Sequence, residues 1–343
     1  MEFIINKRKI GMGETPFIIA EACINHQGDF EIAKQMVEKA HSIGIDCIKF
    51  QIHFLENEML KDTPISDNFD DSLWDTLEKT NLTISEHIQL KELCEKLGII
   101  YLCTPFSRDG ADALEEIGVD FYKVGSGELT NLPLIEHIAK KGKPMIVSTG
   151  MSEVSEIKET VDLIKDFKIP LILTHCTSAY PCPYEIVNLG FIEKLQNLFQ
   201  IPVGLSDHTK GIYTSLGAVA KGACVIEKHF TLDKNQEGPD HQSSLEPEEL
   251  SELHKGVKAV YLSLGNQKKI HEHEKQILAW AREAVVSEVD IKKGDRLTSK
   301  NIWVKRPSPN KGAIPAKEYK NVIGKKALID IKKNSQILWS QIE

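Results

Sequence analysis

The chain reads Phe121-Tyr122-Lys123-Val124-Gly125-Ser126-Gly127-Glu128 over residues 121–128, a short apolar run that passes into polar and charged residues. Eight apolar runs end in this way, at residues 17–20, 47–48, 99–102, 121–122, 145–147, 171–173, 202–205 and 224–226. The segments between them show helical periodicity, with apolar residues at the i, i+3, i+4 and i+7 positions of one face. Eight alternations of strand and helix predict the α/β class and a (β/α)8 TIM barrel, in which the loops after the strands carry the chemistry.

The length of the chain predicts a second, smaller domain. A barrel of about 250 residues leaves a sizeable remainder in a chain of 343 residues. We expect the barrel to span residues 1–265, a charged linker to span 266–283 and a mostly β module to span 284–343. Within the module, residues 290–294 are echoed by residues 330–334, which indicates pseudo-symmetry. The alternating histidines and glutamates at 271–274 are read as part of a solvated linker rather than as a metal site.

Composition narrows the classes of partner. With 42 basic and 50 acidic residues the net charge is -8, which disfavours nonspecific binding to nucleic acid or to an anionic membrane. The N-terminal residues lack a signal-peptide core and no run of about 18 apolar residues is present, so we expect a cytoplasmic protein. The seven cysteines form no C-x-x-C pair and are expected to be reduced core thiols. Cys176 and Cys182, near the predicted active rim, are the two for which reactivity is an alternative.

The predicted strand ends carry a candidate anion site. Lys123 supplies a positive charge, two glycines let backbone N–H groups approach an anion, and Ser126 adds a hydroxyl. Ser148, Thr104 and Ser206 follow neighbouring strands and would complete a cradle for phosphate. Any one of these residues alone is more typical of a turn or a helix cap. Their shared position on one rim favours a binding site.

Two histidines, His208 and His229, end the seventh and eighth predicted strands. Adjacent strands lie about 4.8 Å apart, so both imidazoles would reach one divalent metal. Such a site suits manganese, cobalt or magnesium better than a structural zinc; the alternative is that each histidine only satisfies a hydrogen bond. The candidates for proton transfer or for binding sugar hydroxyls are Glu21, Glu128, Glu227 and Asp240. Among these, Glu227 lies two residues before His229 and is expected to orient that metal ligand.

Eight motifs in this chain resemble those of one enzyme family. They are residues 21–28, 49–51, 104–107, 123–128, 148–151, 175–181, 204–208 and 227–231. In this order they are similar to the bacterial sialic acid synthases, the N-acetylneuraminate synthase family, and the tail resembles the antifreeze-like or SAF domain of these enzymes. The resemblance implies condensation of phosphoenolpyruvate with an N-acylated mannose-type aldehyde. The products would be a nine-carbon 2-keto acid and phosphate, released by C–O cleavage.

The resemblance also implies roles for individual residues. His208 and His229 would hold a divalent metal that polarises the aldehyde oxygen, Mn2+ first with Mg2+ or Co2+ as alternatives. Glu21 would transfer a proton. Phosphoenolpyruvate would be bound by Thr104, Lys123, Ser126, Ser148, Ser178 and Ser206. The sugar would be bound by Lys49, Gln51, His53, Glu128, Tyr180 and Asp240. In a domain-swapped homodimer, Arg306 of the partner subunit would reach the N-acyl group.

Some positions leave the sugar open. Ser178 and Phe50 stand where many N-acetylneuraminate synthases have Asn and His. Residues 238–245 resemble legionaminate synthases and the animal enzymes that take a 6-phosphorylated sugar, whereas residues 51–53 and 56–59 resemble the N-acetylneuraminate type. We expect N-acetylmannosamine as the substrate. The alternatives are 2,4-diacetamido-2,4,6-trideoxymannose, as in an N,N'-diacetyllegionaminate synthase, and the 6-phosphate.

Two other classes of protein compete with this interpretation. A pyruvate-dependent aldolase would form a Schiff base on Lys123, which borohydride would trap covalently. A noncatalytic carbohydrate-binding protein is supported only by the likeness of the tail to an ice-binding module. A noncatalytic binding protein would leave the candidate metal and phosphate residues without a role. Function is inferred from the residues of the site and not from the fold alone, so this class is disfavoured.

Overall fold

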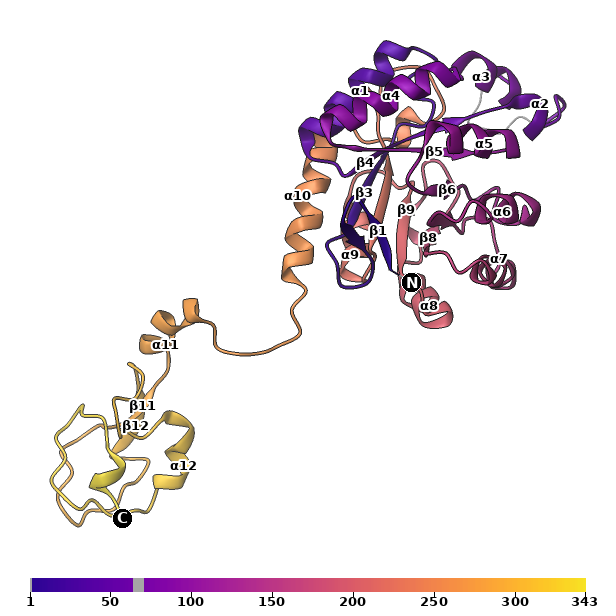
Figure 1. Cartoon of the computed structure of the whole chain (residues 1–343). Coiled ribbons are helices and arrows are strands. Elements are labelled where there is room, and N and C mark those ends of the chain that lie inside the picture. The colour runs from indigo at the N-terminus through magenta and orange to yellow at the C-terminus, as the bar shows by residue number, and fades with distance from the viewer. Residues whose placement is uncertain (1, 64–70) are drawn as a thin grey trace. The chain divides into compact units, whose positions relative to one another are not determined.

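Parallel strands and helices alternate through the N-terminal part of the protein (Figure 1). The structure is a computed structural model that describes residues 2–63 and 71–343. The chain divides into two compact units, Met1–Gly265 and Asn266–Glu343. Residues 64–70 lie outside the described residues.

Eight strands form the barrel sheet, in the order β5-β4-β3-β10-β9-β8-β7-β6, with parallel pairing between neighbours. β5 and β6, at the two ends of this order, also contact each other, so the sheet closes. The strands are β3 (Phe17–Glu21), β4 (Cys47–Ile52), β5 (Ile100–Pro105), β6 (Tyr122–Val124), β7 (Met145–Ser148), β8 (Leu171–Cys176), β9 (Val203–Asp207) and β10 (Val225–His229). Each overlaps one of the eight apolar runs, which confirms the predicted barrel.

The helices between the strands begin and end at residues with clear local causes. The carboxylate of Asp29 accepts hydrogen bonds from the backbone N–H groups of Glu31 and Ile32 where α1 begins. Gly44 ends the same helix in the left-handed conformation, at φ 90°. The helices of this unit are α1 (Phe30–Ile43), α2 (Leu55–Glu58), α3 (Leu73–Thr80), α4 (Ile84–Leu97), α5 (Arg108–Ile117), α6 (Leu132–Ala139), α7 (Val154–Asp166), α8 (Gly190–Phe199), α9 (Tyr213–Ala220) and α10 (Pro247–Ser263).

A short antiparallel hairpin, β1 (Phe3–Ile5) and β2 (Arg8–Ile10), precedes the barrel. Its turn residues Asn6 and Lys7 have φ values of 48° and 68°, as a tight two-residue hairpin turn requires. The apolar side chains of the hairpin cluster with residues of the barrel interior, and the ring of Phe3 meets that of Phe121 edge-on at 5.6 Å. The hairpin, which the sequence analysis does not predict, therefore covers the N-terminal end of the barrel strands.

The C-terminal unit has a hydrophobic core of its own. β11 (Ala284–Ser287) pairs antiparallel with β12 (Ile302–Lys305), and α12 (Tyr319–Val322) and isolated bridges complete the unit. Residues 266–283, expected to form a linker, carry the short helix η3 (Glu272–Glu274) and α11 (Lys275–Ala281). Glu274, the last residue of η3, accepts a hydrogen bond from the backbone N–H of His271 and so caps the N-terminus of η3. This cap explains why a helical turn forms in a segment without apolar periodicity.

The two echoed segments of the C-terminal unit face each other. Asp330 accepts a hydrogen bond of 2.8 Å from the backbone N–H of Lys293, and Asp290 accepts one of 2.8 Å from the backbone N–H of Lys333. The isoleucines that follow the two aspartates exchange backbone hydrogen bonds of 2.9 and 2.8 Å. The two segments thus exchange equivalent hydrogen bonds, which confirms the predicted pseudo-symmetry.

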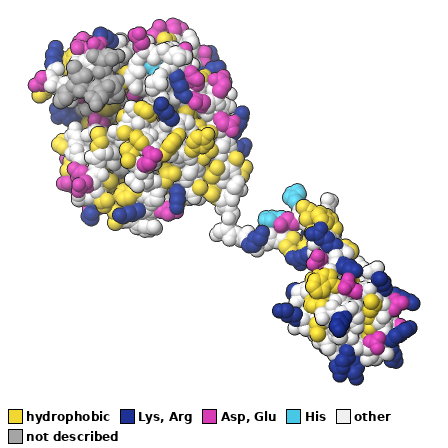
Figure 2. Space-filling model, turned by 180° about the vertical axis from the view of Figure 1, so that it is seen from behind, with side chains coloured by type: hydrophobic (Ala, Val, Ile, Leu, Met, Phe, Trp, Pro, Cys, Tyr) yellow, Lys and Arg dark blue, Asp and Glu magenta, His cyan; other side chains and the backbone are white. Residues whose placement is uncertain are grey.

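The two units differ in charge. Residues 1–265 hold 25 lysines and arginines against 41 acidic residues, whereas residues 266–343 hold 17 against 9. Lysine and arginine side chains are spread over the visible face of the C-terminal unit (Figure 2). Within residues 2–63 and 71–343, no helix has both the length and the apolar character needed to cross a membrane.

Candidate active site

A cavity of about 640 Å³ lies at the C-terminal ends of the barrel strands. Arg306 is the one predicted site residue outside it, in the C-terminal unit, where its guanidinium carbon stands 5.5 Å from the centroid of the Trp280 ring. The predicted residues that line the cavity are Glu21, Lys49, Gln51, His53, Thr104, Lys123, Ser126, Glu128, Ser148, Ser178, Tyr180, Ser206, His208, Glu227, His229 and Asp240. The structure therefore brings together side chains from all parts of the barrel sequence.

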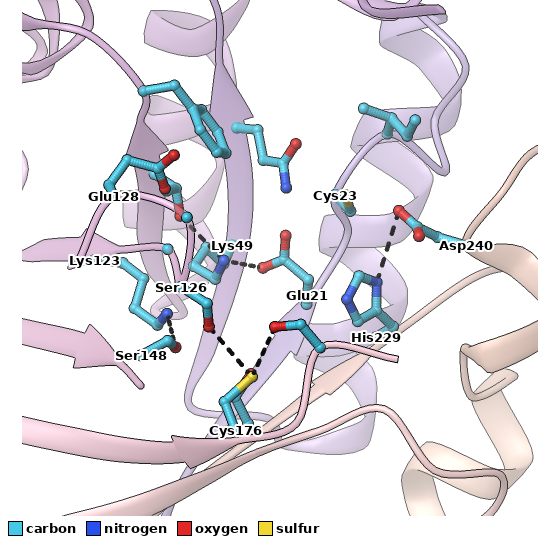
Figure 3. A pocket seen from close by; sticks show the side chains of 18 of the residues that line it. Glu21, Cys23, Lys49, Lys123, Ser126, Glu128, Ser148, Cys176, His229 and Asp240 are labelled. Atoms are coloured by element: carbon cyan, nitrogen blue, oxygen red, sulfur yellow. Dashed lines mark hydrogen bonds and ion pairs between the residues drawn. The ribbon is translucent and has the colours of Figure 1, made fainter. Parts of the chain in front are cut away.

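Strand register places three of these side chains in a row. Glu21 of β3 lies opposite His229 of β10 on one side and opposite Lys49 of β4 on the other. Lys49 Nζ stands 2.5 Å from Glu21 Oε2 and donates a hydrogen bond to Thr104 Oγ1 at 3.1 Å (Figure 3). Both members of the ion pair are buried, so their charges interact strongly.

Lys123 and a group of hydroxyls line another side of the cavity (Figure 3). Lys123 Nζ donates to Ser148 Oγ at 2.6 Å. Gly150 leaves room for the other hydroxyls, because a Cβ at this position would lie 2.7 Å from Ser126 Oγ and closer still to Ser178 Oγ. An ammonium group beside several hydroxyls in a confined space is suited to an oxyanion.

Glu227 joins the two lysines. Its carboxylate stands 3.6 Å from Lys123 Nζ and 3.9 Å from Lys49 Nζ, and it accepts a hydrogen bond of 2.8 Å from Ser206. Burial alone would raise the pKa of Glu227, but the two ammonium charges outweigh it and hold this pKa well below its ordinary value. Burial raises the pKa of Glu21, against the opposing charge of Lys49. Among the described residues Glu21 Oε1 has no hydrogen-bond partner, so Glu21 is a carboxyl group that can gain and lose a proton.

The two imidazoles stand at the same level of adjacent strands, since the residues before them, Asp207 and Lys228, are opposite each other in the register. The ring centroids of His208 and His229 are 5.3 Å apart. His208 Nδ1 donates to the carbonyl oxygen of Thr177 at 2.9 Å, which leaves the lone pair on its Nε2 free. His229 Nδ1 is buried and has no hydrogen bond within the described part of the chain. This pair of available nitrogens fits a divalent metal.

Polar and apolar walls meet in the rest of the cavity. His53 contacts the carboxylate of Glu58 at 2.8 Å and the side-chain oxygen of Gln51 at 3.2 Å. Burial raises the pKa of Glu128 to about 7. The apolar wall consists of Ile24, Met59, Leu73, Leu77 and Phe106. Such a mixture suits a sugar with both hydroxyl and acyl groups.

Several lining residues are absent from the sequence predictions. Cys23 lies in the turn that follows β3, at φ 46°, so strand alternation does not predict the direction of its side chain. Glu58 also lines the cavity, as does Cys176, which the sequence analysis places near the active rim. All seven cysteines are free and buried, as predicted, but Cys23 and Cys176 line the cavity and are not core thiols. The ring of Tyr180 covers that of the first candidate metal ligand, His208, with centroids 4.1 Å apart.

A buried ion pair lies behind the two histidines. Lys228 Nζ stands 3.2 Å from Asp207 Oδ2, and the side chains of both residues are 0% exposed. Side chains alternate along a strand, so this pair points away from the cavity that the histidines face. Asp207 also accepts hydrogen bonds from the hydroxyls of Thr209, Thr214 and Ser215, in the loop after β9 and the start of α9. The pair thus ties together the ends of β9 and β10.

Comparison with known proteins assigns the chain to a family. Residues 36–269 match the NeuB family, and residues 282–343 match the SAF domain. The protein belongs to the NeuB family. This finding confirms the resemblance to sialic acid synthases and the combination of a barrel with a SAF domain.

Relatives in the NeuB family carry names that refer to different sugars. N,N'-diacetyllegionaminic acid synthase of Campylobacter jejuni is 40% identical over 332 residues, which cover 93% of this chain and 98% of that protein. N-acetylneuraminate-9-phosphate synthase of Homo sapiens is 38% identical over 339 residues, 96% of this chain and 94% of that protein. The crystal structure of N-acetylneuraminic acid (sialic acid) synthetase from Leptospira borgpetersenii, in complex with citrate, has a TM-score of 0.73 and 34% identity, and the match covers 81% of this chain and 95% of that one.

Replacing Lys228 tests the buried ion pair. A Lys228→Met substitution removes one partner and leaves the carboxylate of Asp207 buried without its counter-charge, so we expect a loss of about 3 to 5 kcal/mol in the free energy of unfolding. Urea denaturation followed by circular dichroism measures this loss. The control is Lys158→Met, which removes an exposed lysine paired with Asp162 one helical turn away and should cost less than about 1 kcal/mol. Equal effects of the two substitutions would contradict the importance of the buried pair.

Replacing Glu128 tests the effect of its raised pKa. Because the pKa of Glu128 is about 7 in the folded protein and its ordinary pKa is 4.5, the folded state holds a proton that the unfolded state releases between these values. The wild-type protein therefore loses stability as pH rises from about 4.5 to about 7, whereas Glu128→Gln, which mimics the protonated form, does not. We expect the variant to equal the wild type near pH 4.5 and to be more stable above about pH 7, by up to about 3 kcal/mol.

Urea denaturation across this pH range measures the difference. The control is Glu159→Gln, at an exposed helix position, whose stability relative to the wild type should not change with pH in the same way. A Glu128→Gln variant with a constant difference from the wild type at all pH values would show that Glu128 does not titrate in this range.

Proposed function

We propose that this NeuB-family protein is a synthase that condenses phosphoenolpyruvate with an N-acylated mannose-type sugar and water, giving a nine-carbon 2-keto acid and inorganic phosphate. One observation carries the proposal. The Lys123 cradle, suited to phosphate and carboxylate, and the His208–His229 pair line the same cavity, with Glu21 in it as well. A reaction between an anionic enol ester and an aldehyde needs these three features within reach of one another.

The proposed reaction joins the two substrates, consumes water and releases phosphate. The methylene carbon of phosphoenolpyruvate forms a bond to the aldehyde carbon of the sugar, water adds to C2, and the C–O bond to phosphate breaks. Lys123, Ser126, Ser148, Thr104, Ser178 and Ser206 bind the phosphate and carboxylate of phosphoenolpyruvate. Lys49 holds the Glu21 carboxylate in position, as their 2.5 Å ion pair indicates. Glu21 supplies the proton that the aldehyde oxygen gains or accepts one from the attacking water, a role that its raised pKa supports.

His208 and His229 hold a divalent metal, with Mn2+ as the proposed ion, and the metal supplies Lewis acidity to the aldehyde oxygen of the sugar. The residues around them make this role possible. The carbonyl oxygen of Thr177 fixes the His208 ring through its Nδ1. Glu227 lies near enough to His229 to contribute to the electrostatic potential at that ring. His208 and His229 are buried, which strengthens these electrostatic effects.

N-acetylmannosamine is the proposed sugar, with Gln51, His53, Glu128, Tyr180 and Asp240 binding its hydroxyls. A second candidate is 2,4-diacetamido-2,4,6-trideoxymannose, the substrate of an N,N'-diacetyllegionaminate synthase. The apolar wall of Ile24, Met59, Leu73 and Leu77 favours this sugar, because a methyl group at C6 and a second acetyl group would both bury apolar surface there. The names of relatives at 40% and 38% identity support the diacetamido sugar and the 6-phosphate. The name of the Leptospira borgpetersenii synthetase, at 34% identity, supports N-acetylmannosamine.

Phosphate release from phosphoenolpyruvate tests the function. Purified protein with Mn2+ should release phosphate only when a mannose-type sugar is present, and a panel of N-acetylmannosamine, its 6-phosphate and the diacetamido sugar should identify the substrate by kcat/KM. Lys123→Met should reduce kcat/KM by about 100-fold or more, because a charged contact to the anion is lost. The control Lys221→Met removes an exposed lysine and should leave kcat/KM unchanged. Covalent trapping of pyruvate by borohydride, without consumption of phosphoenolpyruvate, would instead identify a Schiff-base aldolase.

A homodimer in which the SAF unit of one subunit covers the barrel cavity of its partner is also proposed, with Arg306 contacting the N-acyl group. The opposite charge balance of the two units supports this arrangement, since 17 basic residues against 9 acidic ones would meet a unit with an acidic excess. Arg306→Ala should raise the KM for the sugar about tenfold while the KM for phosphoenolpyruvate stays constant. An unchanged sugar KM, or a monomer at all concentrations in analytical ultracentrifugation, would refute the arrangement.

A further inference from the structure

Cys23, His229 and Asp240 form a compact group at one side of the cavity (Figure 3). One possible ligand atom from each residue, a thiol sulfur, a ring nitrogen and a carboxylate oxygen, lies within 4.8 Å of the other two. All three residues are at most 7% exposed. Three different donor types from separate parts of the chain thus converge at a place shielded from solvent.

The nitrogen in this group lacks a partner. His229 Nδ1 is buried, has no hydrogen bond to any described residue and stands 4.0 Å from the nearer oxygen of Asp240. That separation is too long for a hydrogen bond. Burying an imidazole nitrogen without a partner costs free energy, and such a nitrogen in a polar cavity indicates that another group binds there. A cation between the nitrogen and the carboxylate would satisfy both.

The backbone at Cys23 also points to a role for its side chain. Cys23 has φ 46°, in the left-handed region that glycine adopts freely and that residues with a Cβ adopt at a cost. The thiol is therefore present at a position where glycine would relieve strain. Strained residues are concentrated at functional sites, where the surrounding structure holds them in place.

We propose that Cys23 and Asp240 are protein ligands of the divalent metal together with His229. The Cys23 thiol gives its proton to solvent as its sulfur binds the ion, and one oxygen of Asp240 binds the ion while the other remains available to a sugar hydroxyl. This proposal rests on the metal site of the proposed function and extends its ligand set. A thiolate ligand favours Co2+ and Zn2+ over the harder Mg2+. A site of two imidazoles and water oxygens alone would distinguish less strongly between these ions.

Optical titration of the metal-free protein with Co2+, without substrates, tests the ligand set. A cobalt–thiolate bond produces an intense near-ultraviolet charge-transfer band, so the wild-type protein should develop this band up to one Co2+ per chain. Cys23→Ser should bind Co2+ without the band. Cys23→Gly, which also relieves the backbone strain, should lose the band too, and this variant keeps the test valid if the serine variant folds poorly.

The other cysteine of the cavity provides the matched control. Cys176 contacts Ser126 Oγ at 3.4 Å and His208 Nδ1 at 3.9 Å, so it is a second thiol near the metal. Cys176→Ser should retain the full band. Binding of Co2+ by the wild type without a band, no binding of Co2+, or a band that disappears in Cys176→Ser but persists in Cys23→Ser would each overturn the proposal.

Competition between metals gives a second readout. Cys23→Ser should weaken Zn2+ binding by at least about tenfold and should leave Mg2+ binding within about twofold. Tenfold is the lower end of the loss of metal affinity caused by substitutions that only affect the partners of metal ligands. Equal weakening for the two ions would overturn the proposal. Neither measurement depends on turnover, so a protein that binds Co2+ through Cys23 but releases no phosphate would contradict the proposed function alone.

Discussion

Four buried charges at one end of the barrel impose the main constraint on this structure. Lys49, Lys123, Glu21 and Glu227 are nearly inaccessible to solvent, and a buried charge is tolerated only when it is paired. Their pairing distances of 2.5 to 3.9 Å depend on the register of β3, β4, β6 and β10. A slip of one residue in any of these strands would point a charge into the apolar layer around the barrel. The charges proposed to bind or position substrate therefore also specify the fold.

The alternation of side chains lets adjacent residues do different work. In β9 and β10 the residues that face the cavity, Ser206 and Glu227 among them, carry the proposed chemistry. Their neighbours Asp207 and Lys228 face outward and fasten the same strand ends to α9. Groups that do not line the cavity thus help to fix the position of the two imidazoles. A change in that outer layer acts on the chemistry only through geometry.

Much of the barrel is predictable from sequence because its strands are buried on both faces and end in polar clusters. The residues that line the cavity are predictable for the same reason, since every parallel strand ends at the same rim. Cys23 was missed because a single cysteine in an apolar segment reads as core, and its left-handed φ has no signature in composition. The hairpin β1–β2 was missed because strands of three residues are too short for a periodic signal. The proposed contact of Arg306 with the cavity of a partner subunit would depend on assembly, which local patterns do not encode.

The reciprocal bonds of the SAF domain have a consequence for how that unit folds. Asp290 accepts a hydrogen bond from the backbone N–H of Lys333, and Asp330 accepts one from the backbone N–H of Lys293. Each loop therefore depends on the other to satisfy a backbone N–H group. A chain cut between the two halves would leave both with unpaired amides and an incomplete apolar core. Half of this unit is therefore not a stable intermediate, and the cooperativity of its folding arises from the exchange between two copies of one short motif.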